Sequence, residues 1–213
     1  MKKIGFITNE KRDINASKTD EIKSFIKSLG HIACESLEDD IDYIIALGGD
    51  GTMLAAVHQV AKRNIPLLGI NLGRLGYLTD TSSEGALEAV GKLLAGDYKV
   101  ERRMMLEAEV LNPAGGSTIA ALNDIVIHRG QSSRPIHYNL SINGEYIESF
   151  CADGVIVATP TGSTAYNLSA GGPLLNPISN MMIITPVCPH MLNAHPIVAG
   201  CEDVISIDID EKE

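Results

Sequence analysis

Short apolar runs alternate with helical patterns in the first part of the chain. Apolar side chains recur three and four residues apart within residues 22–29, 53–61 and 87–94, which predicts helices, the first of them capped by Thr19 or Asp20. The apolar runs between these patterns are expected to be strands, at residues 4–8, 31–34, 42–47 and 65–70. The alternation predicts an α/β domain with a doubly wound, mostly parallel sheet over residues 1–96.

The pattern changes after residue 96. The following segments are β-rich and carry no helical stripe, at residues 98–111, 117–128, 137–142 and 146–158, and further strands are expected at 181–185 and 204–210. Asn143-Gly144 is a typical signal for a two-residue hairpin turn. We therefore expect residues 97–213 to form a second, mostly antiparallel, sandwich-like β-rich domain.

Composition narrows the function classes. The 213 residues hold 27 acidic and 17 basic side chains, a net charge of −10, and no basic block, which argues against nucleic acid and membrane partners. No apolar run approaches the length of a membrane span, and no signal-peptide pattern is present. The four cysteines lie far apart without a C-x-x-C pair, which is typical of reduced thiols in a cytoplasmic protein. Cys188-Pro189-His190 offers two ligands without partners, so no metal site is expected there.

Residues 48–52 read Gly-Gly-Asp-Gly-Thr, directly after a predicted strand and before a predicted helix. Glycines at such a turn let another molecule approach the backbone closely, and backbone N–H groups aimed at one point suit phosphate oxygens. Asp50 repels phosphate unless it has a task such as accepting a proton or holding Mg²⁺. The alternative interpretation is an ordinary left-handed turn in which Asp50 caps the helix.

Two further sites carry candidate chemistry. A second glycine-rich turn at residues 71–77 should lie at the same sheet edge, with Arg74 either a phosphate partner or an exposed loop residue. Asn123 and Asp124 interrupt an apolar strand, so they either face a ligand or occupy a bulge or strand edge.

The segment from Asp153 to Tyr166 reads Asp-Gly-Val-Ile-Val-Ala-Thr-Pro-Thr-Gly-Ser-Thr-Ala-Tyr. A strand opened by Asp-Gly ends in a turn rich in hydroxyl groups, and Ser-Ala-Gly-Gly-Pro at 169–173 prolongs the loop. Several hydrogen-bond donors and one aromatic ring are suited to holding a nucleoside.

Taken together, these motifs resemble the bacterial NAD kinases over nearly the whole chain. Gly-Gly-Asp-Gly-Thr alone also occurs in lipid kinases of the diacylglycerol kinase type, whereas Thr-Pro-Thr-Gly-Ser-Thr-Ala-Tyr followed by Ser-Ala-Gly-Gly-Pro is far more specific. The resemblance implies transfer of a phosphoryl group from ATP or polyphosphate to the adenosine 2′-hydroxyl of NAD, with Mg²⁺. No Walker-type Gly-x-x-x-x-Gly-Lys is present, so the glycine turn and Mg²⁺ should hold the phosphates.

The resemblance also assigns roles to residues. Asp50 matches the general base, and Gly51 leaves room for the nucleotide. Asn123 and Asp124 match the pair that binds the ribose and adenine of NAD, where the family usually has Asn-Glu. Residues that match the adenosine and nicotinamide subsites, supplied in part by a neighbouring subunit of a homodimer or homotetramer, are Asp153, Thr164, Ala165 and Tyr166. The predicted binding set is completed by Gly49, Arg74, Thr161 and Ser169.

Two other functions compete with this interpretation. A lipid or sugar kinase with the same turn needs an apolar groove or a basic cluster, and the sequence shows neither. A nucleotide-binding protein that has lost catalysis is the second alternative, because Asp124 is one methylene shorter than the usual Glu. Family members also usually continue several tens of residues past the position of Glu213, so we expect this chain to be a truncated or partial form.

Overall fold

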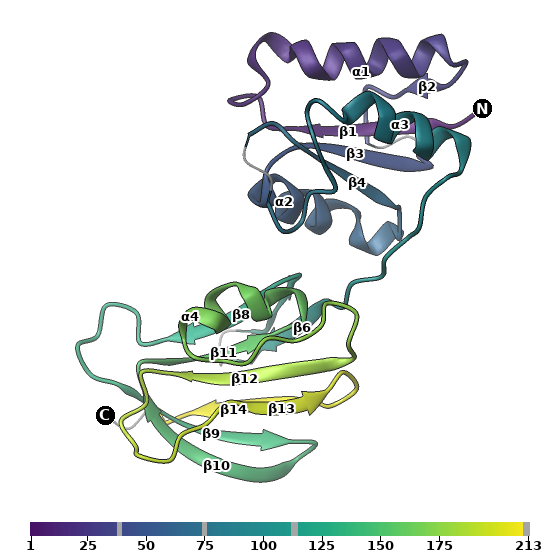
Figure 1. The fold of residues 1–213 in the computed structure, drawn as a ribbon. Coiled ribbons are helices and arrows are strands. Elements are labelled where there is room, and N and C mark those ends of the chain that lie inside the picture. The colour runs from purple at the N-terminus through teal and green to yellow at the C-terminus, as the bar shows by residue number, and fades with distance from the viewer. Residues whose placement is uncertain (38–39, 74–75, 112–114, 211–213) are drawn as a thin grey trace. The chain divides into compact units, whose positions relative to one another are not determined.

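The computed structural model describes residues 1–37, 40–73, 76–111 and 115–210. The chain divides into two compact units, Met1–Val100 and Glu101–Glu213 (Figure 1).

Unit 1 is a parallel α/β unit, as the alternating pattern predicts. Its sheet has the strand order β2-β1-β3-β4-β5, and every neighbouring pair is parallel. The strands are β1 (Lys3–Thr8), β2 (Ile32–Ala33), β3 (Tyr43–Gly48), β4 (Leu67–Asn71) and β5 (Thr81–Ser82). The helices are α1 (Ser17–Ser28), α2 (Asp50–Val60) and α3 (Ala86–Ala95), with short 3₁₀ turns at Ile14–Ala16 and Ala61–Arg63.

Helices cover both faces of this sheet (Figure 1). All six residues of β3 are buried, and successive side chains face opposite sides. Ile45 and Leu47 join the core under α1 and α3, whereas Ala46 packs with Met53 of α2. The prediction of a doubly wound parallel sheet is confirmed.

The start of α1 differs from the prediction. The helix begins at Ser17, two residues before Thr19, and the side chain that satisfies its first turn is Asp13. The Asp13 carboxylate accepts hydrogen bonds from the backbone N–H groups of Lys18 and Thr19, both at 2.9 Å. The capping residue is polar and precedes the helix, so a repeat of apolar residues cannot locate it.

Unit 2 is built from antiparallel strands. A four-stranded sheet has the order β13-β12-β11-β8, a three-stranded sheet the order β10-β9-β14, and β6 pairs with β7. The first strands are β6 (Leu106–Val110), β7 (Ser117–Ala121), β8 (Asp124–His128), β9 (Ile136–Ile142) and β10 (Glu145–Ala152). The remaining strands are β11 (Gly154–Ala158), β12 (Met181–Val187), β13 (Ile197–Gly200) and β14 (Ile205–Ile209).

The two larger sheets of unit 2 share one apolar core. Val155 of β11 and Ile184 of β12 pack with Tyr138 and Leu140 of β9, which is the arrangement of a sandwich. Asn143 and Gly144 join β9 to β10 with φ of 55° and 80°, so the predicted hairpin turn is confirmed.

Several predicted β elements from residue 98 onward are wrong in extent. Residues 98–105 form no strand, the predicted strand at 117–128 is divided at Leu122 and Asn123, and the one at 146–158 is divided at Asp153. The apolar pattern of the sequence does not predict three further elements. They are strand β13, the 3₁₀ turn Thr161–Thr164 and the short helix α4 (Tyr166–Ser169).

Candidate active site

The turn between β3 and α2 has an unexpected geometry. Its helix cap is Gly49, in an extended conformation with φ −131° and ψ −168°, and Asp50 is the first residue of α2. Neither Gly48, Gly49 nor Gly51 has a positive φ, so the alternative of a left-handed turn capped by Asp50 is wrong. These glycines are required for another reason.

Close approach explains two of the three glycines. A Cβ on Gly48 would lie 2.0 Å from the hydroxyl oxygen of Thr52, and one on Gly49 would lie 3.0 Å from Nη1 of Arg12. A Cβ on Gly51 would meet no atom within 4 Å. The backbone at Gly51 is therefore open to a molecule from outside.

The Asp50 side chain points away from its own helix, toward the loop that follows β4. Its two carboxylate oxygens accept hydrogen bonds from the backbone N–H groups of Tyr77 and Leu78, both at 3.0 Å. A Cβ on Gly76 would lie 2.1 Å from Oδ1 of Asp50. The loop thus fixes the carboxylate at a defined orientation through main-chain contacts.

Three loops meet at the carboxyl edge of the sheet. Gly48 pairs with Asn71 at the ends of β3 and β4, and Thr8 pairs with Leu47 at the end of β1. The two glycine-rich turns therefore lie at one edge, as the sequence predicts, which is where parallel α/β sheets bind ligands. The predicted site residue Arg74 lies outside the described residues.

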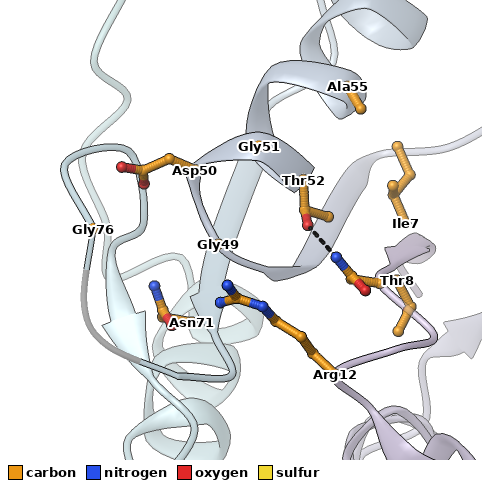
Figure 2. Close-up of a pocket in the computed structure, with 11 residues that line it drawn as sticks. Ile7, Thr8, Arg12, Gly49, Asp50, Gly51, Thr52, Ala55, Asn71 and Gly76 are labelled. Atoms are coloured by element: carbon orange, nitrogen blue, oxygen red, sulfur yellow. Dashed lines mark hydrogen bonds between the residues drawn. The ribbon is translucent and has the colours of Figure 1, made fainter. Parts of the chain in front are cut away.

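A pocket of about 440 Å³ opens at this edge (Figure 2). Among the described residues that line it, Asp50 carries the only negative charge and Arg12 the only positive charge. The lining residues are Ile7, Thr8, Asn9, Arg12, Gly49, Asp50, Gly51, Thr52, Ala55, Asn71 and Gly76. Sequence reasoning missed Asn9 and Arg12, because they lie in a polar stretch that looks like an ordinary loop.

In unit 2 the structure brings Asn123 and Asp124 against the hydroxyl-rich turn. The backbone N–H of Thr159 donates to the carbonyl oxygen of Asn123 at 2.8 Å, and a Cβ on Gly162 would lie 2.0 Å from that oxygen. The Asp124 carboxylate accepts a hydrogen bond from the backbone N–H of Tyr166. Burial raises the pKa of the Asp124 carboxyl, and the Tyr166 hydrogen bond offsets this only in part.

Buried side chains fix the shape of this turn. The Asn167 side chain, fully buried, donates to the carbonyl oxygens of Ser163 and Pro173 and accepts from the hydroxyl of Thr185 at 2.7 Å. Arg103, which sequence reasoning also missed, donates to the Thr161 hydroxyl at 3.2 Å. Thr161 is buried, so its hydroxyl serves the turn itself.

Other predicted residues of the turn face outward. Thr164, Tyr166 and Ser169 are exposed, with 46% of the Tyr166 surface accessible. Ala165 is half-buried between them. These side chains are accessible to a ligand.

Asp153 does not join this group. It precedes β11, whereas Asp124 pairs with Ala158 at the other end of that strand. Five strand residues at about 3.3 Å each separate the two ends. Asp153 instead forms an ion pair with Arg129, with 3.1 Å between Nε and Oδ1.

In the part of the chain that the structure describes, no three His, Cys, Asp or Glu side chains form a metal-binding cluster. No helix among the described residues is long and apolar enough to cross a membrane.

The fold and these residues define a class. An open glycine turn at the carboxyl edge of a parallel α/β sheet suits a phosphate-bearing ligand, and the fixed carboxylate beside it suits proton transfer, which together define a nucleotide-binding enzyme. Comparison with known proteins identifies the family. A model of the ATP-NAD kinase N-terminal domain matches residues 4–98, and one of the ATP-NAD kinase C-terminal domain matches residues 122–213.

Individual proteins similar to this chain are also NAD kinases. The chain is 39% identical to an NAD kinase from Lachnoclostridium phytofermentans over 230 residues, covering 100% of this chain and 81% of that protein. It is 40% identical to an NAD kinase from Thermoanaerobacter sp. over 231 residues, with 100% and 82% covered.

Solved structures similar to this chain are an NADH kinase and an NAD kinase. Yeast NADH kinase complexed with NADH matches with a TM-score of 0.88 at 26% identity, covering 99% of this chain and 73% of that one. An NAD kinase from Archaeoglobus fulgidus in complex with ATP matches with a TM-score of 0.79 at 30% identity, with 98% and 80% covered. The chain belongs to the ATP-NAD kinase family and is a phosphotransferase, so the resemblance seen in the sequence is confirmed.

Proposed function

We propose that this protein transfers a phosphoryl group from ATP to the adenosine 2′-hydroxyl of NAD, forming NADP, with Asp50 as the general base. The observation that carries the proposal is the Asp50 carboxylate, which is the only acidic group among the described lining residues and is held in place by two backbone N–H groups. In the reaction Asp50 accepts the proton of the 2′-hydroxyl as its oxygen attacks the terminal phosphorus of the donor. The bond from that phosphorus to the rest of the donor breaks, and with ATP as donor the leaving group is ADP.

ATP is the donor we favour over polyphosphate, because the Archaeoglobus fulgidus relative is described in complex with ATP. Gly51, with open space over its backbone, would admit the phosphates. We further propose that NAD binds to Asn123, Asp124, Thr164, Ala165, Tyr166 and Ser169 in unit 2. Tyr166 is suited to stacking on a base, and the Asp124 carboxylate to accepting hydrogen bonds from ribose hydroxyls.

Mg²⁺ is expected to arrive with the donor. Asp50 is the only carboxylate among the described lining residues, and Mg²⁺ commonly binds through phosphate oxygens and water with one or two carboxylates. When bound it would neutralise phosphate charge.

Self-association as a homodimer or homotetramer is also part of the proposal. Within one chain Asp153 lies at the opposite end of β11 from Asp124, which supports a nicotinamide subsite supplied by a second copy. Light scattering coupled to size-exclusion chromatography would test this, and a monomer at micromolar concentration with full activity would contradict it. The four thiols, none in a disulfide, support a cytoplasmic location.

The test compares NADP formation by wild type, Asp50→Asn and the exposed control Asp20→Asn, with NAD and Mg²⁺ and either ATP or polyphosphate. We expect activity in wild type and Asp20→Asn, and a loss of at least about 100-fold in Asp50→Asn. An amide at residue 50 would place its NH₂ against one of the two backbone N–H groups, so ATP affinity must also be measured by calorimetry. Near-normal turnover by Asp50→Asn would overturn the general-base role.

A further inference from the structure

Arg12 lies in the loop that follows β1, at the same sheet edge as Asp50. Its backbone N–H donates to the carbonyl oxygen of Asn9 at 2.9 Å, and the next residue, Asp13, anchors the loop to α1. Figure 2 shows the Arg12 side chain extending toward Gly49 and Asn71. The fold around the loop therefore fixes the backbone from which the Arg12 side chain extends.

The guanidinium lies over both glycine-rich turns. Its Nη1 atom would be 3.0 Å from a Cβ on Gly49 and 3.2 Å from a Cβ on Gly73. Even a methyl group at either position would be in tight contact with the guanidinium. Two glycines in the turns that follow neighbouring strands thus leave space for one cation.

Arg12 has no anionic partner among the residues that the structure describes. Arg103 and Arg129 each pair with a carboxylate, of Glu101 and Asp153, whereas no described carboxylate lies within 4.0 Å of the Arg12 guanidinium. No described group accepts a hydrogen bond from it either. An arginine that lines a pocket and is not paired with any described residue is suited to an anionic ligand.

We propose that Arg12 is a phosphate-binding residue of the phosphotransfer site and holds the phosphates of the phosphoryl donor. The proposal rests on the proposed function above and adds a residue to it. A guanidinium offers a planar pair of N–H donors that matches two phosphate oxygens, and its charge offsets the negative charge of the transferring group.

The chemistry of the substrates favours the donor's phosphates over those of NAD. Asp50 acts at the 2′-hydroxyl, and the transferred phosphorus must lie in line with that oxygen. The pyrophosphate of NAD is attached to the 5′ carbon, on the other side of the ribose. A cation in the same pocket as Asp50 therefore meets the phosphate that is being transferred.

The test uses Arg12→Gln, Arg12→Lys and the matched control Lys11→Gln, which removes one positive charge from the neighbouring, exposed residue outside the pocket lining. We expect Arg12→Gln to raise the KM for ATP about 10- to 100-fold and leave the KM for NAD within about twofold. Arg12→Lys should lie between, because a lysine keeps the charge and loses the paired donors. Lys11→Gln should keep both KM values within about twofold of wild type.

Binding of inorganic tripolyphosphate, measured by calorimetry, makes the test independent of turnover. Wild type and Lys11→Gln should bind it, and Arg12→Gln should bind about tenfold more weakly or worse. An Arg12→Gln variant with unchanged ATP KM and unchanged tripolyphosphate affinity would overturn the proposal, as would a rise confined to the KM for NAD. A wild-type protein that forms no NADP would overturn the proposed function, and the tripolyphosphate comparison would still decide the role of Arg12.

Discussion

Gly76 lies against the carboxylate of Asp50 so closely that a Cβ on Gly76 would come within 2.1 Å of Oδ1. The residues are 26 positions apart in the chain, and the contact is made where the start of α2 meets the loop after β4. The adjoining N–H groups of Tyr77 and Leu78 donate to the same carboxylate. The loop after β4 therefore determines where the carboxylate lies.

Gly76→Ala should consequently reduce NADP formation. The added methyl group must push the Asp50 carboxylate or the loop aside, and a displacement near 1 Å can cost about 100-fold in rate. We expect kcat to fall at least about tenfold while the protein stays folded, as measured by coupled assay and circular dichroism.

Gly91→Ala is the matched control for that substitution. Gly91 lies within α3, and its Cβ would make only an ordinary contact with the Phe25 ring at 3.9 Å. Because glycine is unfavourable in a helix, this variant should be about 0.5–1 kcal/mol more stable and keep wild-type activity. Equal activity in the two alanine variants would show that the Gly76 contact does not matter.

The sequence predicts the scaffold of the site better than its contacts. Apolar periodicity is set by burial, so it locates the strands that end at Gly48 and Asn71 and places both glycine turns at one sheet edge. Arg12 and Asn9 leave no such signal, because a polar loop residue is brought to the pocket only by tertiary structure.

The same limit applies to unit 2. Buried side chains of Ser163, Asn167 and Thr185 fix the turn through hydrogen bonds. Those of Ser163 and Asn167 reach carbonyl oxygens three and four residues away, and Thr185 reaches Asn167 from β12, and apolar periodicity reveals none of them. A polar, glycine-containing stretch therefore reads as an open loop although it contains two short helical segments. The separation of Asp153 from Asp124 likewise follows from the strand between them, which motif proximity alone does not reveal.

Asp124→Asn should raise the KM for NAD and make the folded protein more stable at pH 7. Burial raises the pKa of this carboxyl in the folded protein, so the folded state binds a proton more readily than the unfolded state. The resulting destabilisation is present at neutral pH and is relieved as the pH falls from the folded pKa toward the unfolded value near 3.8. Asp124→Asn should therefore unfold at slightly higher denaturant concentration at pH 7, with the gain shrinking in acid, and raise the KM for NAD about tenfold or more.

Asp203→Asn is a control that should change the stability in the opposite direction. Hydrogen bonds from the Asn143 side chain and the Gly200 backbone N–H lower the pKa of Asp203, so its charged form is stabilising. This variant should be less stable than wild type at pH 7. A loss of stability in Asp124→Asn as well would contradict the burial argument.

Tyr138→Phe should leave the free energy of unfolding unchanged or raise it by up to about 1 kcal/mol. The Tyr138 hydroxyl is buried in the sandwich core and has no hydrogen-bond partner among the described residues, while its ring stacks on Phe150 at 5.2 Å. Removing the unsatisfied hydroxyl leaves the ring stacking in place and removes the cost of burying an unpaired polar group. Tyr43→Phe is the comparison, because the Tyr43 hydroxyl is 2.8 Å from that of Tyr98, and we expect it to cost about 1 kcal/mol. Urea unfolding of both variants measures the difference, and a destabilised Tyr138→Phe would indicate a partner for the hydroxyl.

Asp13→Asn should destabilise unit 1 in a pH-dependent way. Burial alone would raise the pKa of Asp13, but hydrogen bonds from the Thr19 hydroxyl and the backbone N–H groups of Lys18 and Thr19 outweigh it and hold the pKa below its ordinary value of 3.8. The stability from this carboxylate is therefore fully present above the unfolded-state pKa and is lost as the pH falls through the lower folded-state pKa. We expect Asp13→Asn to lower the free energy of unfolding by about 1–2 kcal/mol at pH 7, with the difference from wild type shrinking below about pH 4. Urea titrations from pH 7 to pH 2 measure this, and a difference that stays constant over that range would mean that Asp13 acts through shape and not through its charge.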